Sequence, residues 1–131
     1  MSEDIARQFV EAYYTTLQNN KEEMIQFYTE DSIMSSEGNH QKGTKEIQDR
    51  LDGLSFKKIN HEVVSMDAHP SPIENGLLIM ITGKMKMDDD PPFKFAQTFH
   101  LVPNNNGGYF CANDIFRLVM SDKTAPGQEN E

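Results

Sequence analysis

Residues 76–87 of this 131-residue chain read Gly-Leu-Leu-Ile-Met-Ile-Thr-Gly-Lys-Met-Lys-Met, and this stretch decides the fold. In a β-strand, successive side chains point to opposite faces of the sheet. One face of the stretch carries Leu77, Ile79, Ile81 and Met85, and the other carries Leu78, Met80 and Thr82. Because both faces of the first half are apolar, we expect both faces of the sheet to be covered.

Three more strands surround this one in the sequence. A period of two begins at Phe56 and continues to about Ala68, where a segment with two prolines breaks the strand. Residues 93–102 and 109–120 follow, separated by a turn rich in Asn and Gly, and each offers apolar side chains to both faces. Four long strands joined by hairpin-type turns predict an antiparallel sheet.

The N-terminal part of the chain has mostly helical periodicity. A first helix is predicted by apolar residues that recur every four positions: Ile5, Phe9, Tyr13 and Leu17. A second, short helix should follow Asn20, which forms a capping-box-like pair with Glu23, and a third should run from a Thr44 cap to Gly53. Residues 31–42 lack the helical period and predict one or two short strands.

This order of elements predicts an α+β domain, in which three N-terminal helices pack on a strongly curved antiparallel sheet. The helices would cover one face of the sheet. Since no predicted helix is left for the other face, we expect a homodimer that pairs through the sheet. Residues 1–120 should form this single domain, and the polar residues 121–131 should be a disordered tail.

The composition argues against several classes of partner. The chain has 21 acidic and 12 basic residues, which gives a formal net charge of −9. This charge repels phosphate backbones and anionic lipids, and no apolar run reaches the length of a membrane span. We therefore expect no nucleic acid partner and no membrane insertion. The single Cys111 and the lack of a signal peptide predict a soluble protein of a reducing, intracellular compartment.

Three consecutive aspartates, Asp88 to Asp90, precede two prolines at the end of the quoted strand. A turn needs only one Asp or Asn, and neighbouring like charges repel each other. Two interpretations remain open. The triplet is either a solvated hairpin turn or a negative patch that serves a basic partner.

Two titratable residues, His61 and Asp114, fall within apolar strands. They could form a buried polar pair, or His61 could be a core histidine with satisfied hydrogen bonds. Together with Asp67, they are the candidates for a general base if the domain is an enzyme. We expect no metal and no other cofactor, because the remaining histidines have no ligand spacing: His40, His69 and His100.

Several short motifs occur together in this chain. They are Phe9 with Tyr13-Tyr14, Glu37-Gly38, Phe56-Lys57-Lys58-Ile59 with His61, Pro70 with Pro72, Gly83, Asp88-Asp89-Asp90-Pro91, and Asn-Asp-Ile-Phe-Arg-Leu at 113–118. With them, the sequence resembles the nuclear transport factor 2 family over about residues 3–120. The Asp-x-Asp-Pro turn with Glu-Gly is the combination more specific to the import factors of this family. The resemblance implies a cone-shaped fold and a homodimer.

The resemblance further implies a carrier that binds the GTPase Ran in its GDP form. In the family, an apolar pocket inside the cone receives an aromatic side chain of Ran-GDP, and acidic residues on the rim pair with basic residues beside it. By position, the rim residues of this chain are Glu37, Asp88 and Asp90. Such carboxylates steer a basic partner, whereas the buried aromatic anchor supplies most of the affinity.

A second implied activity is weak binding of phenylalanine-glycine (FG) repeats of nucleoporins at the dimer seam. Animal members carry a tryptophan near the start of the first helix, where this chain has Ser2 and no tryptophan anywhere. Residues that could compensate, or else serve the core or the dimer surface, are Met80, Phe93 and Met120. The family's activity implies a location in cytoplasm and nucleus, with enrichment at the nuclear pore and envelope.

The main hypothesis is thus a non-enzymatic carrier that imports Ran-GDP through nuclear pores. One alternative is a scaffold domain of the same fold, of the stress-granule or mRNA-export type, that binds Phe-containing linear motifs. A third is a small-molecule isomerase or dehydratase, since the cone fold hosts such enzymes and a fold alone does not select a function.

Overall fold

The computed structural model describes residues 2–119; Met120 and the predicted tail, 121–131, lie outside the described residues. The elements are α1 (Ser2–Asn19), the 3₁₀ helix η1 (Lys21–Phe27), β1 (Ile33–Ser36), β2 (Asn39–Lys42), α2 (Gly43–Asp52), β3 (Ile59–Pro70), β4 (Leu77–Met87), β5 (Phe93–Pro103) and β6 (Tyr109–Val119). Three helical elements followed by long strands confirm the predicted α+β class. Among the described residues, no helix is both long and apolar enough to cross a membrane.

The six strands form one sheet in the order β2-β1-β6-β5-β4-β3. The four long strands pair antiparallel, as predicted, but β1 runs parallel to β6. The sheet is therefore mixed, and the prediction of a purely antiparallel sheet was wrong. The cause is the long connection between these two strands, since a parallel neighbour needs a crossover rather than a hairpin.

Two predicted caps are also corrected. The second helix is 3₁₀, and the Asn20 side chain makes no capping hydrogen bond. Helix α2 begins at Gly43, with Lys42 as its N-cap, and the Thr44 hydroxyl instead donates to the Glu30 carboxylate. The predicted end of this helix at Gly53 is confirmed.

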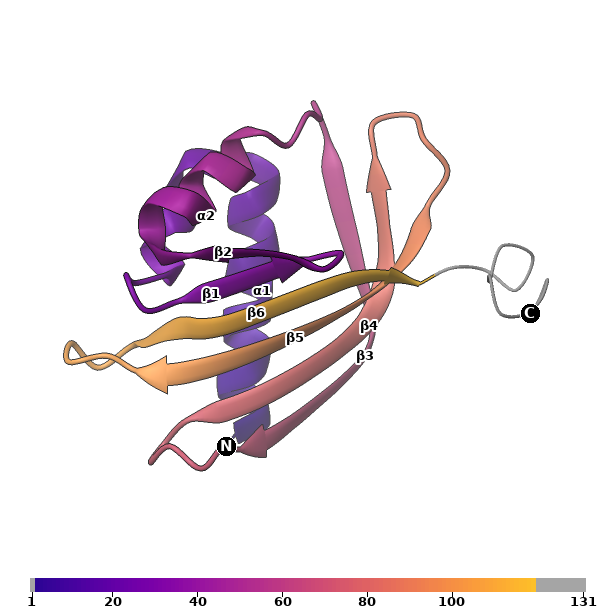
Figure 1. Ribbon diagram of the computed structural model, residues 1–131. Helices are drawn as coiled ribbons and strands as arrows, with labels where there is room; N and C mark the ends of the chain where they lie inside the picture. Colours follow the sequence, from indigo (N-terminus) through magenta and orange to yellow (C-terminus); the bar gives the residue numbers. More distant parts are fainter. Residues whose placement is uncertain (1, 120–131) are drawn as a thin grey trace.

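Helix α1 packs across one face of the long strands and runs behind them in Figure 1. The face of β4 that carries Leu77, Ile79, Ile81 and Met85 is buried and forms the inner face of the sheet. Aromatic rings of α1 meet the sheet there, and the Tyr13 and Phe99 ring centroids are 4.8 Å apart. No helix of residues 2–119 covers the opposite face, where Leu78 and Met80 are exposed.

Candidate functional site

A cavity of about 230 Å³ lies between the helical layer and the inner face of the sheet. Its walls are mostly apolar, and both the helices and the strands of the sheet contribute residues to them. The lining residues that the argument uses are Tyr13, Glu37, Arg50, His61, Gln97 and Asp114. An apolar cavity with a few convergent polar groups is the usual form of a binding site.

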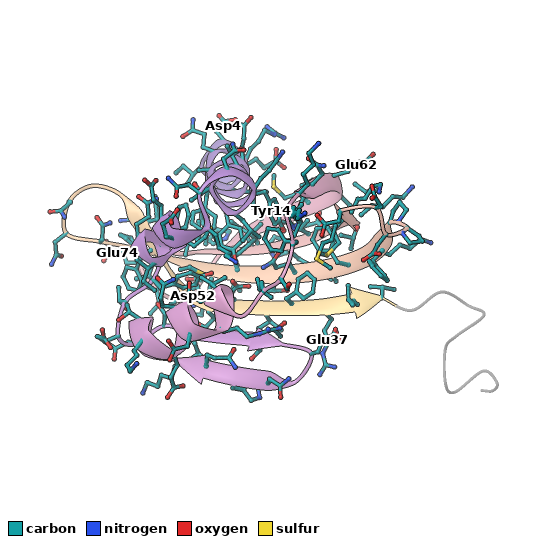
Figure 2. All side chains as sticks on the ribbon, turned by 90° about the horizontal axis from the view of Figure 1, so that it is seen from above. Asp4, Tyr14, Glu37, Asp52, Glu62 and Glu74 are labelled. Atoms are coloured by element: carbon teal, nitrogen blue, oxygen red, sulfur yellow. The ribbon has the colours of Figure 1, made fainter. Side chains whose placement is uncertain are left out.

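The polar floor of this cavity is centred on Asp114 of β6, which is 1% exposed. Its Oδ2 accepts hydrogen bonds from the hydroxyls of Tyr13 and Tyr28, each at 2.8 Å, and its Oδ1 accepts one from the Gln97 amide at 2.7 Å. The Tyr14 hydroxyl donates to the Gln97 carbonyl oxygen at 2.6 Å. Tyr14 lies between α1 and the sheet in Figure 2. The floor is thus a closed network in which each polar group already has partners.

Burial controls the ionisation of this floor. Desolvation raises the pKa of Asp114, and the hydrogen bonds from Gln97, Tyr13 and Tyr28 oppose that rise. Burial, followed by the nearby Asp114 charge, also raises the pKa of Tyr13, Tyr14 and Tyr28. The tyrosines therefore remain hydrogen-bond donors at neutral pH.

His61 of β3 lies beside this network without joining it. Its ring stacks on Tyr14, with ring centroids 4.2 Å apart, and meets the Phe95 ring edge-on at 5.5 Å. Its Nδ1 is buried and has no hydrogen-bond partner among the described residues, and burial lowers the pKa of His61 to about 4. Both His61 and Asp114 line the cavity, but the structure does not pair them by a hydrogen bond, which corrects the hypothesis of a buried polar pair.

Glu37 lies at the mouth of the cavity, in the turn between β1 and β2. Its backbone N–H donates to the Phe116 carbonyl oxygen at 3.2 Å, and its Oε2 accepts from the Leu118 N–H at 2.7 Å. Figure 2 shows Glu37 at this turn, next to the end of β6. The carboxylate is therefore fixed against β6 while it stays exposed to solvent.

Asp88 and Asp90 lie in the turn that follows Met87, which itself lines the cavity. Asp88 has a positive φ of 52°, and its Oδ1 accepts from the N–H groups of Lys57 and Lys58 at 2.9 and 2.8 Å. These hydrogen bonds, first from Lys58 and then from Lys57, lower the pKa of Asp88. Within residues 2–119, the Asp90 side chain makes no hydrogen bond, so its charge is the more available of the two to a partner.

Comparison with known proteins identifies this architecture. The profile of the Nuclear transport factor 2 (NTF2) domain matches residues 5–118. The chain belongs to the nuclear transport factor 2 family. It is 36% identical to Nuclear transport factor 2 of Schizosaccharomyces pombe, over 87% of this chain and 93% of that protein, and 36% identical to that of Emericella nidulans, over 91% and 96%. The solved structure of nuclear transport factor 2 from Cryptosporidium parvum superposes with a TM-score of 0.87 at 36% identity, covering 90% of this chain and 94% of that one.

Of the residues considered for FG repeats, Met80 and Phe93 lie on opposite faces of the sheet. Met80 lies on the sheet face opposite the helices, where it pairs in register with Thr98. Phe93 begins β5 opposite Met85, so strand alternation places it on the inner face. Met120 lies outside the described residues.

The other chemical candidates are dispersed. Asp67 is exposed on β3 and pairs in register with Met80, away from the cavity. His40 hydrogen-bonds to Ser35, and His100 to Ser71 and Asn113. Within the described part of the chain, no group of three His, Cys, Asp or Glu side chains could hold a metal ion.

Sequence reasoning missed two parts of the site. Gln97 sits between Phe95 and Phe99 on the inner face of β5, and this polar residue in an apolar alternation was a usable signal. Arg50 at the cavity mouth had no such signal, because its place depends on how the end of α2 packs beside β1.

Proposed function

We propose that this chain is a nucleocytoplasmic transport carrier that binds Ran in its GDP form and nucleoporins with FG repeats. The observation that carries the proposal is the apolar cavity with Glu37 at its mouth, in a chain whose family relatives are named Nuclear transport factor 2. An aromatic side chain of Ran would fill the cavity, and basic residues of Ran would pair with Glu37, Asp88 and Asp90. The carrier would shuttle between cytoplasm and nucleus and concentrate at the nuclear pore and envelope.

The carrier works as a homodimer in this proposal. Exposed apolar residues gather on the sheet face opposite the helices, including Leu78, Met80 and Ile115. Met80 of β4, Thr98 of β5 and Ile115 of β6 lie in one register row across three strands. Pairing of two such faces would remove this apolar surface from water. Both apolar faces of β4 would then be covered.

The proposal includes no catalysis. A general base needs a proton acceptor that a substrate can reach. Asp114 is buried and already accepts three hydrogen bonds, and its raised pKa reflects its desolvation. This closed floor suits a pocket that holds an inserted side chain better than one that removes a proton.

Isothermal titration calorimetry with Ran, loaded in parallel with GDP and GTP, tests the proposal. We expect binding of the GDP form only, and weaker binding at higher salt because exposed charges are screened. Absence of binding to Ran-GDP would reject the proposed function.

Charge reversal then tests the rim. Asp90→Lys should weaken binding of Ran-GDP by about tenfold or more, roughly 1.4 kcal/mol, without loss of the turn, since the Asp90 side chain makes no hydrogen bond to the described part of the chain. Glu74→Lys is the matched control, because Glu74 is an exposed acid at the opposite end of β4. It should bind Ran-GDP like the wild type.

A further inference from the structure

Arg50 is a half-buried cation at the cavity mouth, in the last turn of α2. A guanidinium has five N–H donors. In the described residues, its recorded side-chain hydrogen bond is that from Nη2 to the Ser36 hydroxyl at 3.1 Å, and no ion pair is recorded for it. Most of its donors therefore have no protein acceptor within residues 2–119.

The acids near the mouth do not neutralise this cation. Glu37 also lines the cavity, but its Oε2 accepts from the Leu118 N–H, and no Glu37–Arg50 ion pair is recorded among residues 2–119. Asp88 accepts through Oδ1 from two backbone N–H groups. A half-buried guanidinium without a carboxylate partner beside apolar walls is costly unless a ligand supplies the anion.

The position of Arg50 also keeps its charge in place. The C-terminal end of a helix carries partial negative charge, which favours a cation in its last turn. The hydrogen bond to Ser36 of β1 holds the guanidinium next to the cavity. Arg50 is thus oriented before any ligand arrives, and planar guanidinium groups recognise carboxylates through two parallel hydrogen bonds.

We infer that Arg50 is an anion receptor at the cavity mouth, and that it reads a carboxylate carried by the partner next to the aromatic side chain that enters the cavity. The inference rests on the proposed function for the nature of the partner. A protein is the expected source of the carboxylate, because the mouth is bordered by exposed charges of both signs, from Glu37 to Lys57 and Lys58, which an extended surface can contact. Glu37 and Arg50 together would fix the orientation of the bound segment.

Small probes test the anion site without Ran. We would titrate the full chain with 3-phenylpropanoate and with its neutral amide and follow amide chemical shifts by NMR. The acid should bind at least about tenfold more tightly than the amide, and Arg50→Gln should abolish this preference. Equal binding of acid and amide to the wild type, or a preference for the acid that persists in Arg50→Gln, would overturn the inference.

Calorimetry with Ran-GDP tests the partner. Arg50→Gln should weaken binding by about 10- to 100-fold, as expected for the loss of a charge-assisted hydrogen bond, and Arg50→Lys should lie between Gln and the wild type. Lys45→Gln is the matched control: it removes one positive charge from the same helix, where Lys45 is 88% exposed and pairs with Asp49. It should change binding less than about twofold.

A charge swap separates recognition from a loss of structure. If Arg50→Glu abolishes binding of Ran-GDP, a Lys at the partner's acid beside the aromatic anchor should restore it. Unchanged binding by Arg50→Gln would overturn the role in partner recognition while the proposed function stands. If the wild type does not bind Ran-GDP, the proposed function and this partner role both fail, and the probe titration still decides whether Arg50 is an anion receptor.

Discussion

The buried carboxylate of Asp114 connects the helical layer of the fold to the sheet. Three hydrogen bonds join it to α1 through Tyr13, to the segment after η1 through Tyr28, and to β5 through Gln97. A buried polar group is stable only when its partners are present, and removal of one partner leaves the others unsatisfied. Asp114 therefore fixes the helical layer relative to the sheet, and with it the depth of the cavity.

Two substitutions of Asp114 should differ strongly in stability. Asp114→Ala leaves the Gln97 amide and one of the two tyrosine hydroxyls without an acceptor, since the hydroxyls of Tyr13 and Tyr28 can bond only to each other, and it should cost about 3–5 kcal/mol of unfolding free energy. Asp114→Asn retains an acceptor toward Gln97 and should cost clearly less. Because burial raises the pKa of Asp114, the carboxyl stabilises the fold below its unfolded pKa, and this contribution is lost as pH rises through the folded pKa. Urea denaturation at several pH values measures the unfolding free energies of the wild type and both variants. Equal costs for Asp114→Ala and Asp114→Asn would contradict the role of the network.

His61 should make the protein sensitive to acid. Its folded pKa of about 4 lies below the ordinary value of 6.5, so its contribution to stability is present above pH 6.5 and is lost as pH falls toward 4. From pH 7 to pH 4, we expect the unfolding free energy of the wild type to fall by about 3 kcal/mol more than that of His61→Phe. Phe keeps the ring between Tyr14 and Phe95 but does not titrate. Paired denaturation curves test this, since carboxylates titrate alike in both proteins.

At the scale of elements, β3 and β4 owe their curvature to a bulge opposite a glycine. The register of β3 against β4 shifts between Val63 and Ser65, directly beside Gly83. A Cβ on Gly83 would collide with the Glu62 carbonyl oxygen and lie 3.0 Å from the Phe95 ring. A bulge bends a strand and increases its twist. Gly83 therefore permits the close approach of the two strands at the bend.

Gly83→Ala should destabilise the fold by about 1–3 kcal/mol, because backbone or the Phe95 ring must move. Gly53→Ala is the control, since Gly53 has an ordinary φ of −79° and a Cβ there would make only normal contacts, at 3.5 Å. It should be neutral or slightly stabilising. Thermal unfolding of both variants gives the comparison, and a neutral Gly83→Ala would show that the bend does not depend on this glycine.

Sequence patterns predicted the long elements and missed how the short ones meet. The alternation of β4 separated its two faces, because residues 77–87 contain enough periods, but both faces are apolar in the first half and the pattern did not say which one the helices cover. The parallel contact of β1 with β6 involves only four residues and is set by tertiary packing, which a local pattern does not encode. The same holds for the site. A sequence motif made Glu37 a candidate, whereas Arg50 reaches the cavity only because α2 ends beside β1.

At the scale of the whole molecule, the two faces of the sheet have separate tasks. The inner face packs against α1 and contains the cavity, and the outer face presents exposed apolar side chains. Met80 is 51% exposed and Ile115 is 48% exposed, and both flank Thr98 in one register row. A contiguous apolar face of this kind is typical of an interface rather than of a solvated surface.

The last prediction concerns the proposed homodimer. Ile115→Lys places a charge in the centre of the outer face and should raise the dissociation constant of the dimer by about 30-fold or more, equivalent to roughly 2 kcal/mol. The monomer should stay folded, because residue 115 is exposed in the single chain and its backbone pairing with β5 is unaffected. Sedimentation equilibrium measures the association, and circular dichroism checks the fold.

Val64→Lys is the control for this prediction, since Val64 is 61% exposed but lies at the bulge of the edge strand β3, beside α1 rather than on the outer face. It should leave the dimer intact. A monomeric wild type, or an Ile115→Lys variant that dimerises as tightly as Val64→Lys, would contradict pairing through the sheet. Binding of Ran-GDP by a monomeric Ile115→Lys variant would then show that each cavity works independently.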